Sequence, residues 1–315
     1  MENKNNQTKN FIGELLGLPT PAKAAGAVFT LASVVPVILA VVFMLITGAL
    51  GLLTTDVNKQ NWYIYANMLL VQFSFLLVSA CYFYWTKIPL KTAITEQKCP
   101  FKYFIIAIIL QFGLISLSSV NELFLQWLGL IGYEDSSMAG TEQLLQTSPF
   151  LLLLLVLAVL PAIFEEVIFR GLLFQGLRAF GTVGSVLLCG GLFSLYHQNP
   201  AQTIYQFCCG AAFALVVVRS GSILPTMLSH FLNNALVLIL YNPEGTALPM
   251  PVFIVGLVCL IGALAYLIFI DKRVACTQAI EIKEAKKERK DFWIFAAIGI
   301  IICLVSWGTI LLSGM

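Results

Sequence analysis

Long apolar stretches separated by short polar segments run along almost the whole chain. A helix needs about 20 mostly apolar residues to cross the hydrocarbon core of a bilayer. Nine stretches approach or exceed that length, namely residues 27–53, 63–85, 103–121, 148–168, 180–196, 201–218, 223–241, 251–270 and 292–312. The pattern therefore predicts an all-α polytopic membrane protein with about eight or nine transmembrane helices.

The composition excludes several other classes of protein. The chain has 315 residues, of which 59% are hydrophobic and 11% are charged, whereas soluble domains carry about 25% charged residues. Disordered, collagen-like and nucleic-acid-binding proteins need a polar or basic composition, so we expect no nucleic-acid partner. The 8 cysteines are scattered and form no CxxC pair, which argues against a disulfide framework.

The basic residues predict the orientation of the spans. If the N-terminus is cytosolic, 17 of the 18 Lys and Arg residues fall on the cytosolic side, and only Lys59 falls outside. Cytosolic segments of membrane proteins carry this excess of basic residues. We therefore expect an integral membrane protein with a cytosolic N-terminus. Its short loops and the lack of an organelle-targeting signal favour a bacterial plasma membrane, with membrane lipids as partners.

The same pattern divides the chain into four parts. Residues 1–23 form a cytosolic or interfacial segment, with a short interfacial helix predicted over 10–18. Residues 24–147 hold the N-terminal transmembrane helices, and 148–241 form a core in which polar residues interrupt the apolar spans. Residues 242–315 hold the C-terminal helices, joined by a charged cytosolic linker over 271–291.

The fourth predicted span contains two adjacent carboxylates and an arginine. A charge at the centre of a bilayer costs at least about 2.5–3.5 kcal/mol, so ionisable residues inside spans are candidates for function. Glu166 and Arg170 stand four residues apart and can pair on a helix. Glu165 points about 100° away from Glu166, which leaves one carboxylate free to react. The alternative is a polar cap where the span leaves the membrane.

The two histidines of the chain both lie in or beside predicted spans. His197 ends the fifth span, and His230 lies inside the seventh, four residues before Asn234. Side chains four residues apart leave the same face of a helix, so His230 and Asn234 are expected to point together. Two histidines, two glutamates and an asparagine in apolar spans indicate a shared polar site.

Hydrolysis of a peptide bond is one reaction that this set of residues could catalyse. Glu165 could act as the base that activates water, and His197 could hold the same water. His230 and Asn234 could donate hydrogen bonds to the tetrahedral oxyanion. The residues also suit a zinc site, with Glu166, His197 and His230 as ligands. The sequence alone does not separate the two mechanisms; we favour no cofactor and keep zinc as the alternative.

A shared site places a condition on the fifth span. The predicted spans put Glu165, Glu166 and Arg170 toward the inner half of the membrane, and His197 near its outer side. The fifth segment must then be short, tilted or re-entrant. Irregular backbone is tolerated in a membrane where protein surrounds it, and four glycines would permit it here: Gly181, Gly184, Gly190 and Gly191.

Three short motifs resemble the signature of the CAAX protease and bacteriocin-processing family, also called CPBP or Abi, to which the type II CAAX prenyl endopeptidase belongs. They are EExxxR at Glu165–Arg170, FxxxH at Phe193–His197 and HxxxN at His230–Asn234, in the order of the family. The resemblance implies a helical intramembrane fold around a polar cavity that opens toward the cytosol.

The resemblance also implies an intramembrane endopeptidase. Glu165 and His197 would activate water, His230 and Asn234 would form the oxyanion hole, and Glu166 and Arg170 would support them. The substrate would be a peptide or a lipidated protein, either a prenylated CAAX tail or a leader sequence.

Two other functions stay open. A non-catalytic scaffold or immunity protein could share the same fold, and intramembrane Glu and His also serve as proton relays in transporters. Other intramembrane proteases fit poorly. All four aspartates fall outside the predicted spans, and the chain contains no HExxH motif and no GxSx context for a serine nucleophile.

Overall fold

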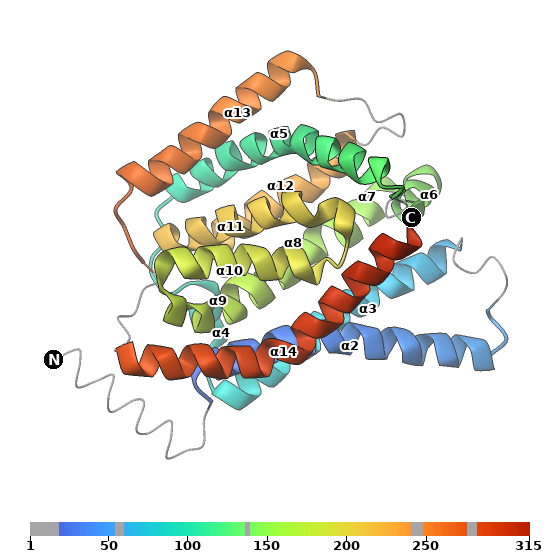
Figure 1. The fold of residues 1–315 in the computed structure, drawn as a ribbon, viewed down its shortest axis with the longest axis horizontal. Coiled ribbons are helices and arrows are strands. Elements are labelled where there is room, and N and C mark those ends of the chain that lie inside the picture. The colour runs from blue at the N-terminus through green and yellow to red at the C-terminus, as the bar shows by residue number, and fades with distance from the viewer. Residues whose placement is uncertain (1–18, 54–59, 136–138, 241–247, 276–281) are drawn as a thin grey trace.

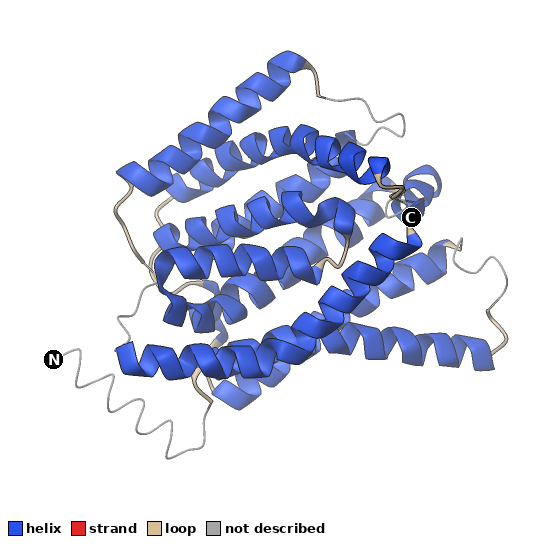
Figure 2. Ribbon diagram, viewed as in Figure 1, coloured by secondary structure: helices blue, strands red, loops and turns tan. Residues whose placement is uncertain are grey.

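The computed structural model describes residues 19–53, 60–135, 139–240, 248–275 and 282–315. Across these residues the chain is built from helices, without a β-strand (Figure 2). A single antiparallel bridge joins Thr95 to Ser222. The prediction of an all-α polytopic membrane protein is confirmed. The interfacial helix predicted over 10–18 lies outside the described residues.

The helices follow one another with short connections. In chain order they are α2 (Pro21–Ala49), α3 (Asn61–Thr86), α4 (Leu90–Ile94), α5 (Lys102–Leu130), α6 (Ala139–Thr147), α7 (Phe150–Leu153), η2 (Leu154–Val159), α8 (Leu160–Glu166), η3 (Val167–Leu173), α9 (Phe174–Leu177), η4 (Arg178–Phe180), α10 (Gly181–Tyr196), η5 (Pro200–Gln202), α11 (Thr203–Ser220), α12 (Leu224–Leu240), α13 (Met250–Ala265), η6 (Tyr266–Ile270) and α14 (Ile282–Ser313). Of the η elements, η2, η3 and η6 are π-helical, and η4 and η5 are 3₁₀ turns.

The long helices form three groups (Figure 1). Helix α14 packs along α2, and α3 joins them at one edge of the molecule. Helix α13 packs along α5 at the opposite edge. The segment from α8 to α12 lies between these two groups. The polar residues identified in the sequence therefore lie in the middle of the bundle, with helices on both sides.

Seven helical stretches of the described chain are long and apolar enough to cross a membrane, fewer than the nine predicted spans. The difference has two causes. The stretch Phe150–Tyr196 counts once, although it contains two predicted spans that the chain connects through a 3₁₀ turn and Gly181. Leu224–Leu240 is apolar but shorter than the other stretches. Each predicted span still coincides with a helix.

The boundaries of two predicted spans were wrong, and the predicted charged linker overlaps a helix. The helix of the fourth span does not end at residue 168 but continues through η3 and α9 to Leu177. The third span is part of the longer helix Lys102–Leu130. The charged linker predicted over 271–291 overlaps α14. This helix begins at Ile282, and its first turns carry those charges.

Glycines let neighbouring helices approach closely. A Cβ atom on Gly210 of α11 would lie 2.8 Å from the Cα atom of Gly190 on α10, and one on Gly299 of α14 would lie 2.7 Å from the Cα atom of Thr30 on α2. Small residues allow such contacts between backbones in membrane helices. The contact between α10 and α11 holds α10, which ends just before His197, against the centre of the bundle.

Candidate active site

The predicted span placed the two carboxylates toward one end of a helix. In the structure they lie in the middle of the helical stretch that runs from Phe150 to Leu177. The π-helical stretches η2 and η3 flank the α-helical segment that carries Glu165 and Glu166. Wider turns of this kind often occur at functional sites. Wider turns rotate the segment between them relative to the rest of the helix.

Glu166 is the centre of a fully buried group of charges. Its Oε1 atom accepts hydrogen bonds from Arg170 Nη1 at 2.7 Å and from His230 Nδ1 at 3.0 Å. The pairing of Glu166 with Arg170, predicted from their spacing, is confirmed. Glu166 has no exposed surface, and Arg170 and His230 are 1% and 5% exposed. Removing one member would leave a buried charge without its partner.

Aromatic rings enclose the Arg170 guanidinium. Its Cζ atom lies 4.2 Å from the ring centre of Phe193 and 5.2 Å from that of Phe213, and its Nη2 atom donates to the carbonyl of Gly210 at 3.4 Å. A cation over an aromatic face is stabilised most when water is excluded. Phe193, the first residue of the second motif, thus has a structural role in the site.

Glu165 lies on the side of the His230 ring that carries Nε2. Its Oε2 atom lies 3.8 Å from His230 Nε2, which is longer than a hydrogen bond. This oxygen is buried and has no hydrogen-bond partner in the described part of the chain. Buried polar atoms in proteins are usually paired, so an unpaired carboxylate oxygen at this point is available to a water or a substrate.

His197 and Glu165 stand equally far along the chain from the turn at Gly181, which removes the reason to expect them on opposite sides of the membrane. Glu165 precedes Gly181 by 16 residues, and His197 follows it by 16. Both arms are helical, and α10 packs back against α9 and η3 of the first arm. The fifth segment is a regular helix from Gly181 to Tyr196 and need not be re-entrant. Glu165 also acts electrostatically on His197.

The tautomer of His197 follows from its hydrogen bond. His197 Nδ1 lies 2.8 Å from the carbonyl oxygen of Phe193. Because a carbonyl can only accept, Nδ1 must carry the proton. The neutral imidazole then has a free lone pair on Nε2. His197 can therefore accept a proton or a hydrogen bond through Nε2.

Asn234 contacts the helix that carries the carboxylates. Its Nδ2 atom donates to the carbonyl of Leu157 at 3.0 Å. Pro161 explains why this carbonyl is available, because proline has no N–H to donate to the residue four positions earlier. The contact holds α12 against η2 and fixes Asn234 beside the site. One hydrogen of the Asn234 amide remains for another acceptor.

Comparison with known protein families was made on this segment. Residues 147–236 match the family described as type II CAAX prenyl endopeptidase Rce1-like. We call residues 147–236, which resemble this family, the Rce1-like segment. The match confirms the resemblance to CAAX proteases and supports a CAAX-type intramembrane protease, and hence a peptidase. No match was found among the curated proteins or among the solved structures.

The Rce1-like segment contains all three motifs. A polar network connects it to α5, which lies outside this segment. Gln111 on α5 donates to Asn233 Oδ1 at 2.8 Å, and Asn233 Nδ2 donates to Asn234 Oδ1 at 3.0 Å. Tyr205 donates to the same Asn233 oxygen, and Ser229 donates to Gln111 Oε1. Apart from Asn234, the motifs do not specify the residues of this network. Buried Gln and Asn in apolar spans are the signal that could have found them.

The alternative zinc set does not gather into a ligand group in this arrangement. No cluster of three His, Cys, Asp or Glu side chains that could hold a metal occurs among the described residues. Glu166 instead faces the Arg170 guanidinium, and a second cation at the same oxygen would be repelled. As arranged, Glu166 Oε1 and His230 Nδ1 are hydrogen-bonded to each other.

Proposed function

We propose that the chain is an intramembrane endopeptidase that hydrolyses peptide bonds of membrane-associated or lipid-modified substrates with water activated by Glu165 and His197. The observation that carries the proposal is the division of roles between the adjacent carboxylates. Glu166 is held at Oε1 by hydrogen bonds from Arg170 and His230, whereas Glu165 makes no hydrogen bond within the described chain and approaches only His230, at 3.8 Å; the Oε2 atom of each carboxylate is buried without a hydrogen-bond partner there.

The proposed water lies between two acceptors. Glu165 offers a carboxylate oxygen, and His197 offers the Nε2 lone pair that its bond to Phe193 leaves free. A water that donates one hydrogen to each acceptor directs its own lone pair toward the substrate carbonyl. Glu165 then takes the proton as the water oxygen bonds to the carbonyl carbon, and later returns it to the departing amine. General-base catalysis of this kind contributes about 10²–10⁴-fold in rate.

The oxyanion of the tetrahedral intermediate would be held by His230 and Asn234. His230 Nδ1 is bonded to Glu166, so donation from Nε2 requires an imidazolium with both nitrogens protonated. An imidazolium would also balance the charge of Glu165, whose Oε2 lies 3.8 Å from His230 Nε2, because Arg170 already pairs with Glu166. The remaining hydrogen of the Asn234 amide would supply the second donor. Preorganised donors of this type stabilise the developing charge.

The substrate class follows from the resemblance of the segment to type II CAAX prenyl endopeptidases. A prenylated CAAX tail and a bacterial leader peptide are the two candidates. Both are peptides presented at a membrane surface, and both would enter a site that lies within the bundle. We propose the lipidated or membrane-associated peptide as the common class.

A cleavage assay with metal analysis tests the proposal. The protein is purified in detergent and offered a fluorogenic prenylated CAAX peptide and a leader peptide, with wild type compared with Glu165→Ala and His197→Ala. We expect cleavage of at least one peptide by wild type, which survives chelation and is abolished in both variants while the protein stays folded.

The other outcomes contradict the proposal in different ways. Loss of cleavage on chelation with recovery on added zinc would indicate a metalloprotease. A Glu165→Ala variant that supports the cellular role, together with no cleavage of either peptide by wild type, would indicate a non-catalytic scaffold.

A further inference from the structure

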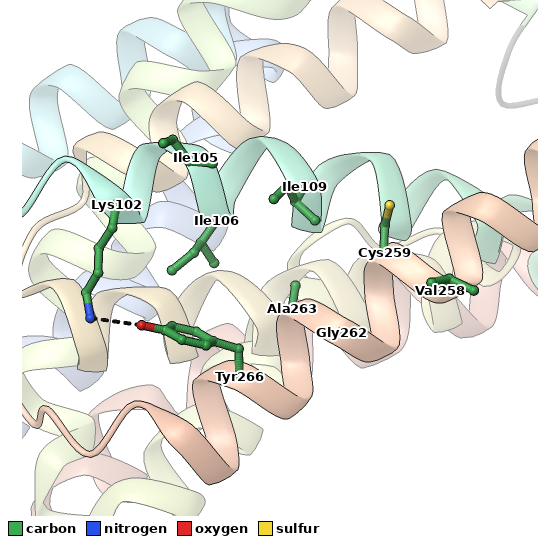
Figure 3. A pocket seen from close by; sticks show the side chains of 9 residues that line it. All are labelled: Lys102, Ile105, Ile106, Ile109, Val258, Cys259, Gly262, Ala263 and Tyr266. Atoms are coloured by element: carbon green, nitrogen blue, oxygen red, sulfur yellow. Dashed lines mark hydrogen bonds between the residues drawn. The ribbon is translucent and has the colours of Figure 1, made fainter.

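A groove separate from the active site runs between α5 and α13, at the edge of the bundle (Figure 3). It has a volume of about 420 Å³, within the range of ligand-binding pockets. Its walls are apolar over most of their length: Ile105, Ile106 and Ile109 from α5, and Val258, Gly262 and Ala263 from α13. The groove lies on the outer side of α5, whereas Gln111 on the same helix faces the active-site network.

One end of the groove is polar. Lys102, the first residue of α5, extends to Tyr266 at the end of α13, and its Nζ atom lies 3.1 Å from the Tyr266 hydroxyl (Figure 3). The same nitrogen donates to Asp271 Oδ2 at 3.0 Å. An ammonium group has three N–H donors, so one remains for a further acceptor. The Lys102 side chain is 45% exposed, which makes that donor accessible.

The charge around this end is positive. Lys98, Lys102, Lys272 and Arg273 lie within the short segments 98–102 and 271–273, against the single carboxylate of Asp271. Burial raises the pKa of Asp271, but hydrogen bonds from Lys102, the backbone of Arg273 and Tyr103 outweigh it and lower that pKa below its usual range. Asp271 therefore stays ionised and holds Lys102 in place. This one carboxylate does not neutralise the other basic residues, which are Lys98, Lys272 and Arg273.

A long apolar groove with a cationic end matches the two parts of a phospholipid. Lysine side chains place their ammonium group at the membrane surface and their methylenes along apolar surface, and tyrosines are enriched at the same depth. The positive-inside pattern puts this end of α5 on the cytosolic side, where anionic lipids attract clusters of basic residues. From Lys102 to Ile109 the groove follows α5 for about 10 Å.

We infer that the groove between α5 and α13 binds one anionic phospholipid, with an acyl chain between the two helices and the phosphate at Lys102 and Tyr266. Gly262 provides a direct way to test this. A Cβ atom on Gly262 meets nothing within 4 Å, and Gly262 lines the groove, so Gly262→Leu places a side chain where the lipid would lie. Gly308 on α14 is equally open but does not line the groove, and Gly308→Leu is the matched control.

The experiment measures lipid-dependent stability. Wild-type protein is delipidated in detergent and its Tm is followed while dioleoyl phosphatidylglycerol, dioleoyl phosphatidylcholine or glycerol phosphate is added. We expect a saturable rise in Tm with phosphatidylglycerol alone. Gly262→Leu should abolish the rise, Gly308→Leu should keep it, and Lys102→Gln should weaken lipid binding by about fivefold. Lys102→Arg should restore it.

Three results would overturn the inference. An equal rise with phosphatidylcholine would mean that any lipid covers this face. An equal rise with glycerol phosphate would mean that the phosphate binds without the acyl chain. A phosphatidylglycerol effect that survives Gly262→Leu would locate the lipid elsewhere. Comparing Tm shifts and not Tm values keeps the test valid if a variant is itself less stable.

Discussion

The helices at the centre of the bundle and the α2–α14 pair are held together by different kinds of contact. Between α2 and α14 the contact is made by small and apolar residues, with Gly26 against Phe292 and Gly299 against Thr30. At the centre, Glu166 and Arg170 bury full charges without any exposed surface at their side chains. Replacing a buried ion pair by apolar residues is often neutral or stabilising.

The difference between the two regions indicates which of them carries the function. The α2–α14 pair joins two long helices with no ion pair between them in the described residues, where Lys23 only lies over the ring of Phe295, so packing does not explain the ion pair at the centre. The charged site lies inside the Rce1-like segment, whereas α2 and α14 lie outside it. We therefore expect substitutions at the centre to change catalysis, and substitutions between α2 and α14 to change stability alone.

The largest expected effect is on catalysis. His197→Ala removes the Nε2 acceptor from the proposed water and should lower kcat for peptide cleavage by about 10²–10⁴-fold. Thermal unfolding should change little, because within the described residues the imidazole makes one hydrogen bond, to the Phe193 carbonyl. A variant with normal kcat would remove His197 from the mechanism.

The motifs predicted part of this site, and the rest depended on distant contacts. The spacing of Glu166 and Arg170 was enough to predict their pairing. It could not predict that His230, 64 residues later in the chain, shares the same carboxylate oxygen. Gln111 was missed because it lies on another helix, 122 residues from Asn233.

The error in the fourth span has the same origin. An apolar window ends at a charge, so the predicted span ended before Arg170. The pairing with Glu166 neutralises that charge inside the bundle, and the helix continues through the buried residues of η3.

The next effect is on the stability of the centre. Arg170→Met leaves Glu166 buried beside His230 alone and should lower the free energy of unfolding by about 3–5 kcal/mol. The double variant Glu166→Gln with Arg170→Met should recover part of that loss, because it buries no unpaired carboxylate. Equilibrium unfolding in detergent measures both. A double variant as unstable as Arg170→Met would contradict this explanation.

A smaller effect is expected between α2 and α14. The Cβ of Gly299→Leu would meet the backbone of Thr30 at 2.7 Å, and overpacking of this kind costs about 1–3 kcal/mol. Cleavage per folded molecule should be unchanged. Gly308→Leu, on the same helix in open space, is the control and should leave unfolding unaltered. If Gly299→Leu lowered kcat in the folded fraction, the two regions would be coupled.

The smallest effect concerns the network that orients Asn234. Gln111→Leu removes the interhelical hydrogen bond to Asn233 and the one that Gln111 accepts from Ser229, contacts worth about 0.6 kcal/mol each in membrane proteins. We expect kcat to fall by about threefold with KM unchanged. Gln72→Leu is the matched control, because Gln72 is a buried glutamine on α3 whose Oε1 has no partner in the described residues. Equal effects of the two substitutions would argue against a positioning role.

The most direct test of the central claim compares two Glu→Gln substitutions in one assay. Glu165→Gln keeps the size and polarity of the side chain but removes the base, whereas Glu284→Gln changes an exposed carboxylate near the start of α14. Single-turnover cleavage of a prenylated CAAX peptide is measured for both in the presence of a chelator. The proposal predicts a loss of at least about 10²-fold for Glu165→Gln alone. Wild-type rates for Glu165→Gln would contradict it.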